Sequence, residues 1–178
     1  SLNNDKDNAI LVFHALTGDQ FVTGVNPVTN KDGWWSYAVG PGKSIDTEKY
    51  FVICANVIGG CMGSWGPKEI DKKNNEPYGL NFPVITIRDM VKAQETLLDH
   101  LGIKKLLCAT GGSMGGMQLL QFCTTFPNKT FSAVPIACST SHSAQNIALN
   151  ELARQAIMAD PVWDKGKYSR KNVQPKNG

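Results

Sequence analysis

LLCATGGSMGGMQLLQF, residues 106–122, is the stretch that decides the fold of this chain. The apolar run over 105–110 predicts a buried strand, and apolar residues then recur at helical spacing from Met117 to Phe126. Between the two, residues 111–115 fit the pattern G-x-S-x-G, in which a serine lies in a sharp turn between a strand and a helix. The stretch therefore predicts a strand–turn–helix unit with Ser113 at its corner.

Such a corner suits a nucleophile. The turn strains the backbone of the serine, and glycines two residues to either side leave room for it. The hydroxyl is then exposed at the carboxyl edge of the sheet, where the ligand sites of α/β proteins lie. The helix that begins at Met114 directs free N–H groups and its positive dipole end toward an oxyanion formed on a carbonyl attacked by Ser113. We predict Ser113 as the nucleophile and the Met114 amide as one oxyanion donor.

Two phosphate-binding alternatives each fail on one residue. A dinucleotide-type G-x-G-x-x-G would need glycine at position 113, where serine stands. A Walker A loop that ends at residues 42–44 would need glycine at position 37, where tyrosine stands.

Strand and helix patterns alternate along the rest of the chain. Further buried strands are predicted at 9–13, 50–55 and 131–137. Helices are predicted near 34–39, from the Thr86–Asp89 capping box to Gly102, and over 144–159. This alternation predicts an α/β fold with a mostly parallel sheet and helices on both faces. We expect one domain over 1–178, with 165–178 as a linker or tail.

Composition narrows the class of protein further. A chain of 178 residues with 42% hydrophobic content supports one domain with a substantial core. A net charge of +3 implies no nucleic-acid partner and no anionic membrane surface. The five cysteines show no CxxC spacing and suit a reducing cytoplasm. Without an 18-residue apolar run or a signal-peptide pattern, the chain is expected to be soluble.

The loop at 14–18 follows the first predicted strand. A second oxyanion donor is expected from a loop after an earlier strand, and we choose the Leu16 amide. A serine nucleophile also needs a histidine as general base. His14 is better explained by a structural hydrogen bond, His100 by the dipole at a helix end, and His142 as a polar residue near a helix cap.

Other candidate residues have structural explanations. Asp160, next to Pro161, is interpreted as a helix terminator rather than the acid of a triad. Arg154 could meet a carboxylate substrate, but pairing with Glu151 is the more frequent arrangement. Cys61 lacks a neighbouring base or helix start and is interpreted as a packed loop cysteine.

Motifs along most of the chain, from residue 8 to about 168, resemble the homoserine O-acetyltransferase family, which has the α/β-hydrolase fold. A match at so many ordered segments is more specific than the G-x-S-x-G motif alone. The segments are HALTG (14–18), GWW (33–35), GPGK (40–43), FVICANV (51–57), GGCMGS (59–64), GP (66–67), TIRDMV (86–91), GGSMGGMQ (111–118), SAQNIA (143–148) and RQA (154–156).

The resemblance implies transfer of an acetyl group from acetyl-CoA to the hydroxyl of L-homoserine, in the pathway to methionine, through an acyl-serine intermediate. Ser113 would be the nucleophile, and the Leu16 and Met114 amides would form the oxyanion hole. No metal and no cofactor beyond the co-substrate acetyl-CoA is implied, and the protein would be a cytoplasmic homodimer. Homologues that use succinyl-CoA or acylate serine share these motifs, and a serine esterase of the same fold stays open.

The remaining members of the triad are expected beyond residue 178. In the hydrolase fold the nucleophile comes first in the chain, then the acid, then the histidine, and no strand-like run follows Ala137. The resemblance makes residues 144–178 the start of a helical lid region. Residues 1–178 alone would be catalytically incomplete with an open sheet edge. A catalytically incomplete fragment with only a structural role is the alternative of another class.

Overall fold

The computed structural model describes residues 1–168 and 173–177, which fall into two compact units. The first, here called the sheet unit, consists of Ser1–Ser64 and Ile85–Ser139. The second, here called the α3 unit, consists of Trp65–Val84 and the described part of Thr140–Gly178.

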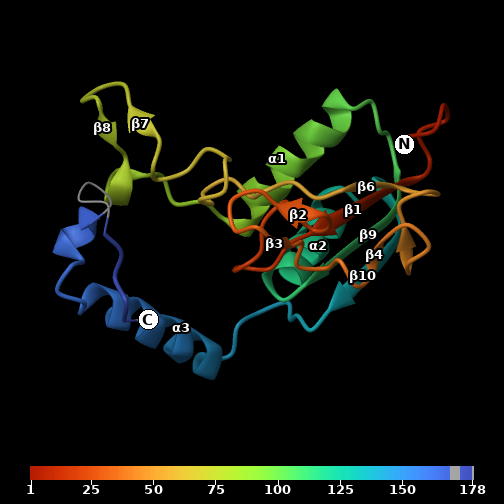
Figure 1. Cartoon of the computed structure of the whole chain (residues 1–178). Helices are drawn as coiled ribbons and strands as arrows, with labels where there is room; N and C mark the ends of the chain where they lie inside the picture. Colours follow the sequence, from red (N-terminus) through yellow and green to blue (C-terminus); the bar gives the residue numbers. More distant parts are fainter. Residues whose placement is uncertain (169–172, 178) are drawn as a thin grey trace. The chain divides into compact units, whose positions relative to one another are not determined.

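A four-stranded parallel sheet forms the centre of the sheet unit (Figure 1). Its strands, in the spatial order β10-β9-β1-β6, are β10 (Thr130–Ile136), β9 (Leu106–Gly112), β1 (Ala9–Phe13) and β6 (Phe51–Ile53). Phe13 lies opposite Gly111, and Ile136 lies opposite Gly112. The carboxyl ends of three neighbouring strands therefore meet at one edge, and the predicted parallel α/β architecture is confirmed.

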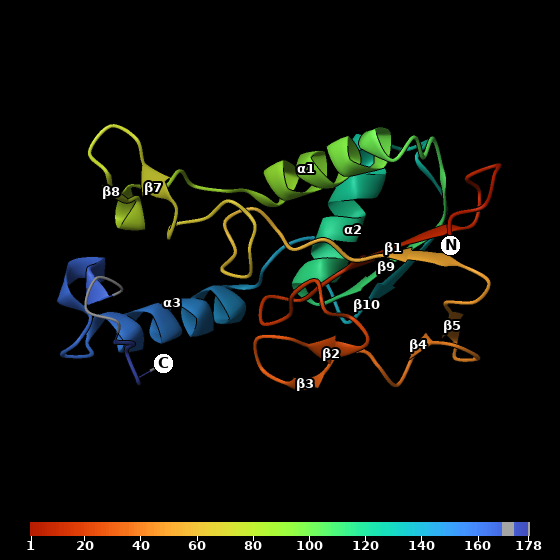
Figure 2. The same cartoon turned by 45° about the horizontal axis from the view of Figure 1, so that its top comes forward.

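Helices α1 (Ile87–His100) and α2 (Met114–Thr125) cover one face of this sheet, and the segment that contains β2 to β5 covers the other (Figure 2). The predicted helices on both faces are therefore not found in the described sheet unit, where short strands and turns cover the second face. Strand β1 explains the division, because its side chains alternate between the two faces. Leu11 and Phe13 pack with the helices, whereas Ile10 and Val12 pack with the β2–β5 segment. Burial on both faces is the reason that β1 is a continuous apolar run.

Short paired segments flank the sheet. They are β2 (Val25–Asn26) with β3 (Lys31–Asp32), and β4 (Val39–Gly40) with β5 (Ile45–Asp46). The helix predicted near 34–39 is wrong. Ser36 N–H donates to Gly33 O at 3.0 Å and Ala38 N–H to Trp35 O at 2.9 Å, so the chain makes successive tight turns instead. Val39 then pairs in β4 and is fully buried in the core, which ends any helical path.

The predicted capping box at the start of α1 is confirmed. Asp89 N–H donates to Thr86 Oγ1 at 3.2 Å, and Thr86 N–H donates to Asp89 Oδ2 at 2.9 Å. Two of the free amides at the helix start are satisfied in this way. The bonds from Thr86 also lower the pKa of the Asp89 carboxyl.

The α3 unit contains helix α3 (Ala144–Met158), close to the predicted 144–159. Its other elements are β7 (Ile70–Asp71), β8 (Glu76–Pro77) and the 3₁₀ turns η1 (Gly79–Asn81) and η2 (Asp164–Gly166). Trp65, Tyr78 and Phe82 form an aromatic cluster with ring centroids 4.6–5.7 Å apart. The lid assignment for 144–178 stays a prediction, and 169–172 and 178 lie outside the described residues. No described helix is long and apolar enough to cross a membrane.

Strand β10 lies at an edge of the four-stranded sheet. Its side chains are mostly exposed, and those of Phe131, Val134 and Ile136 are 76%, 49% and 40% accessible. An apolar strand in this position presents unpaired backbone groups along one side.

Replacing Thr86 by alanine tests the capping box. We expect Thr86→Ala to lower the free energy of unfolding by about 1 kcal/mol, because the Asp89 amide loses its side-chain acceptor. The measurement is urea denaturation followed by circular dichroism. Thr96→Ala is the matched control, since Thr96 lies inside the same helix and bonds only the Lys92 carbonyl. Equal losses in the two variants would show that the cap contributes nothing.

Candidate active site

Ser113 lies between the last residue of β9 and the first residue of α2, at the carboxyl edge of the sheet. Its φ of 55° and ψ of −121° lie in a region that residues with a side chain rarely adopt. Its N–H donates to Ile136 O at 3.0 Å, which ties the turn to β10. The side chain is exposed, so the strained turn presents the hydroxyl to solvent as the sequence predicts.

The glycines around Ser113 allow helix α2 to approach β1 backbone to backbone. A Cβ atom built on Gly115 would overlap the carbonyl oxygen of Phe13. One on Gly111 would lie 2.6 Å from the Gly115 carbonyl oxygen, and one on Gly116 would lie 2.6 Å from Cys138 Sγ. The glycines are therefore required by packing between elements as well as by the turn itself.

The two predicted oxyanion donors lie at this same edge. Met114 is the first residue of α2, and Leu16 lies in the loop that follows β1 and is 72% exposed. In the described part of the chain, neither amide donates a hydrogen bond within the protein. Both are available to an external acceptor, and their catalytic role stays a prediction.

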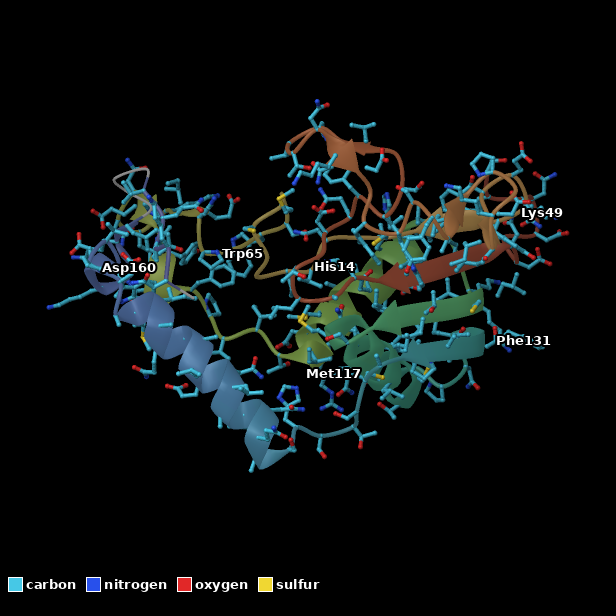
Figure 3. All side chains as sticks on the ribbon, turned by 60° about the horizontal axis from the view of Figure 1, so that its bottom comes forward. His14, Lys49, Trp65, Met117, Phe131 and Asp160 are labelled. Atoms are coloured by element: carbon cyan, nitrogen blue, oxygen red, sulfur yellow. The ribbon has the colours of Figure 1, made fainter. Side chains whose placement is uncertain are left out.

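His14 opens the loop after β1 and has the structural hydrogen bonds that the sequence suggests. It is only 2% exposed; Val57 N–H donates to Nε2 at 3.2 Å, and Nδ1 lies 2.8 Å from Ala15 O. Because the amide can only donate, Nε2 is the acceptor nitrogen and Nδ1 carries the hydrogen. Figure 3 shows His14 and Met117 toward the carboxyl ends of the strands, and Lys49 and Phe131 toward the amino ends. With both nitrogens occupied, His14 is unsuited to act as the general base.

The other two histidines are exposed residues at helix boundaries. His100 is the last residue of α1, and His142 precedes α3 in the other unit. These positions fit the structural explanations given by the sequence. Neither residue lies at the carboxyl edge of the sheet within the sheet unit.

Asp160 does more than end α3. Its carboxylate accepts hydrogen bonds from the amides of Val162 at 2.9 Å, Lys176 at 2.8 Å and Asn177 at 3.2 Å. These bonds lower the pKa of the carboxyl, the Val162 amide most strongly. Asp160 therefore holds the 176–177 segment, a role that the sequence does not indicate because the partners are 16 and 17 residues away.

The prediction for Arg154 is confirmed, whereas the prediction for Cys61 is not. Arg154 forms an exposed ion pair with Glu151 at 2.6 Å, the arrangement that the sequence favours. Cys61 is exposed, so its interpretation as a packed cysteine is wrong. Gly59 and Gly63 on either side of Cys61 both have positive φ, and the thiol lies outside the packed part of this loop. By contrast, burial raises the pKa of the Cys54 thiol to about 12, with a smaller contribution from the charge of Asp19.

Comparison with known protein families identifies the family to which the chain belongs. Residues 8–178 match the family model described as alpha/beta hydrolase fold. The chain belongs to the alpha/beta hydrolase fold family. The matched range includes both the β9–Ser113–α2 turn and the loop after β1.

Several curated relatives of this alpha/beta hydrolase are named homoserine O-acetyltransferase. The chain is 67% identical over its whole length to homoserine O-acetyltransferase of Pelagibacter ubique and 62% identical over 99% of its length to that of Nitrobacter hamburgensis. The chain covers 48% and 44% of these relatives, so it spans about half the length of the curated proteins it matches. The resemblance predicted from the sequence is confirmed.

Solved structures agree with the sequence comparison. Homoserine O-acetyltransferase of Bacillus anthracis superposes with a TM-score of 0.90 at 31% identity over 98% of this chain and 48% of that one. Esterase E22 superposes with a TM-score of 0.84 at 33% identity over 97% of this chain and 49% of that one. The same fold therefore appears in proteins named as a transferase and as an esterase.

Replacing glycines tests the close approach of the α2 backbone to the β1 backbone beside the Ser113 turn. We expect Gly115→Ala to lower the free energy of unfolding by about 1–3 kcal/mol or to prevent folding, because α2 must move away from the Phe13 carbonyl. Gly112→Ala is the matched control, since its Cβ would meet nothing closer than Ile136 O at 3.9 Å. The midpoints of thermal unfolding are compared. The packing argument fails if Gly112→Ala is the more damaging change.

Replacing Asp160 tests the clamp on residues 176–177. In Asp160→Asn the amides of Lys176 and Asn177 lose a charged acceptor, and we expect their hydrogen exchange to accelerate several-fold. In the parent protein the protection of the same two amides, corrected for the slower intrinsic exchange in acid, should also fall at low pH. The stabilisation is complete above the unfolded-state pKa and is lost as the pH falls through the lowered folded-state pKa. Asp71→Asn, in the same unit, is the control and should leave both amides unchanged.

Proposed function

We propose that the protein transfers an acetyl group from acetyl-CoA to the side-chain hydroxyl of L-homoserine, through an acetyl ester on Ser113. One observation carries the proposal. An exposed serine in a strained strand-to-helix turn stands in a chain 67% identical to a homoserine O-acetyltransferase. A strained serine has no purpose in a scaffold, which argues against a merely structural role.

The chemistry has two halves. Ser113 Oγ attacks the thioester carbonyl carbon while a general base takes the hydroxyl proton. The C–S bond then breaks, and coenzyme A leaves as the thiol with that proton. In the second half, the homoserine oxygen attacks the acetyl-serine carbonyl, its proton passes to the base, and Ser113 Oγ leaves and is reprotonated. The Leu16 and Met114 amides bind the oxyanion in both halves.

The proposal assigns the general base and its acid to residues outside 1–178. His14 has both ring nitrogens engaged, and His100 and His142 lie at exposed helix boundaries. The carboxylate of Asp160 accepts bonds from backbone amides. The curated relatives are about twice as long as this chain, which leaves room for the two groups.

A serine esterase is the second candidate, favoured by the likeness to esterase E22. The two activities share the acylation step and differ in whether water or homoserine removes the acetyl group. A site that excludes water favours transfer. Succinyl-CoA as donor and serine as acceptor are variants of the same chemistry.

The proposal extends to the setting of the protein. It places the protein in the cytoplasm as a homodimer, with acetyl-CoA and L-homoserine as its small-molecule partners. The support is the resemblance to homoserine O-acetyltransferases together with a formal net charge of only +3, which favours no anionic partner.

Ser113→Ala tests the proposed chemistry in the complete gene product. We expect loss of at least 10³-fold in acetyl transfer and no acetyl group on the protein by mass spectrometry after mixing with acetyl-CoA. Ser132→Ala is the control, because the Ser132 hydroxyl donates to the Leu107 carbonyl within the sheet, on strand β10. Unchanged turnover in Ser113→Ala would refute the acyl-serine mechanism. Hydrolysis of acetyl-CoA that outpaces transfer to homoserine would favour the esterase instead.

A further inference from the structure

The peptide group between Ala15 and Leu16 is held on its carbonyl side by two donors. Gly18 N–H donates to Ala15 O at 3.0 Å, and His14 Nδ1–H donates to the same oxygen at 2.8 Å. The carbonyl oxygen and the Leu16 N–H belong to one planar unit. No cis peptide bond occurs in the described chain, so the two groups point in opposite directions. Whatever fixes the direction of Ala15 O also fixes the direction of the Leu16 N–H.

The imidazole that bonds Ala15 O is itself firmly placed. Its other nitrogen accepts from Val57 N–H at 3.2 Å, and the ring is 2% exposed. The carbonyl of His14 accepts from Gln118 Nε2 at 3.2 Å, and Gln118 is fully buried on α2. His14 is thus connected to the loop after β6 and to the helix that starts at the nucleophile.

The surroundings of Leu16 make this connection important. The Leu16 side chain is 72% exposed and gives the loop little packing. Hydrogen bonds rather than buried apolar area must therefore hold the loop in one conformation. The donor to Ala15 O also polarises the peptide group and makes its N–H a better donor.

We propose that His14 is a positioning residue for the oxyanion hole: its Nδ1–H holds the Ala15 carbonyl so that the Leu16 amide faces the oxyanion formed at Ser113. The inference rests on the proposed acyl-serine chemistry and deepens it. His14 neither touches the substrate nor moves a proton. It acts only by fixing the direction of the Leu16 N–H.

Two substitutions separate the two hydrogen bonds of the ring. In His14→Asn the amide nitrogen takes the place of Nδ1 and can still donate to Ala15 O. In His14→Gln the longer side chain places its amide near Nε2, where it can meet Val57 but not Ala15 O. Both variants bury one amide in the same cavity, so a comparison between them cancels the cost of that burial. Thr110→Val is the control for loss of a buried side-chain bond to backbone, since Thr110 Oγ1 donates to Val134 O.

The readout is acylation of Ser113 in the complete gene product, measured as the burst of p-nitrophenol from p-nitrophenyl acetate and from its thionoester. Sulfur accepts hydrogen bonds weakly, so the ratio of the oxo-ester rate to the thionoester rate reports the oxyanion hole. We expect His14→Gln to lower the oxo-ester rate by about 10- to 100-fold. This is less than the 10²–10³ of removing such a donor outright, because the amide remains. We expect a smaller loss of thionoester rate, and His14→Asn and Thr110→Val close to wild type in the ratio.

The outcomes distinguish failure of the positioning role of His14 from failure of the proposed acyl-serine chemistry on which that role rests. A wild-type protein that releases no p-nitrophenol from the oxo-ester and carries no acetyl group on Ser113 by mass spectrometry would refute acyl-serine chemistry. A wild-type burst with equal ratios in His14→Asn and His14→Gln would overturn the positioning role alone. Equal losses on both esters in His14→Gln would do the same, since they would indicate general damage to the fold. A ratio that falls only in His14→Gln supports the proposal even if both variants are less stable.

Discussion

The close approach of the α2 backbone to the end of β1 is the constraint on which the site depends. At Gly115 no side-chain atom fits against the Phe13 carbonyl, and at Gly111 the space is taken by the start of α2. This contact sets the distance between the Ser113 turn and the loop after β1. The Ser113 turn, the start of α2 and the loop that contains Leu16 therefore extend from one packed junction.

Burial of β1 on both faces gives that junction its rigidity. One face packs against α1 and α2 and the other against the segment that contains β2 to β5, so β1 cannot shift without disturbing both clusters. Gln118 and His14 then extend the rigidity into the exposed loop through hydrogen bonds. The site is thus built from a rigid apolar interior and a small number of buried polar contacts.

The sequence predicts the parts of this fold that have strong local signals. The apolar runs of β1, β9 and β10, the Thr86–Asp89 cap and the Ser113 turn are confirmed because each depends on residues close together in the chain. The helix near 34–39 is wrong because tertiary burial of Val39 overrides local preference. The contacts of His14 with Val57 and of Asp160 with Lys176 join distant residues, and no spacing rule reveals them.

The cysteines differ in environment enough to give the molecule one chemically addressable position. Cys61 is the exposed thiol among the five, and Cys54 has a pKa of about 12 that keeps it protonated near neutral pH. Since only a thiolate reacts readily with an alkylating reagent, brief treatment with a maleimide fluorophore would place the dye mainly at Cys61. Its loop begins after Val57, the residue that anchors the His14 ring. A dye there would give an optical signal for movement next to the loop that contains Leu16 without any engineered residue.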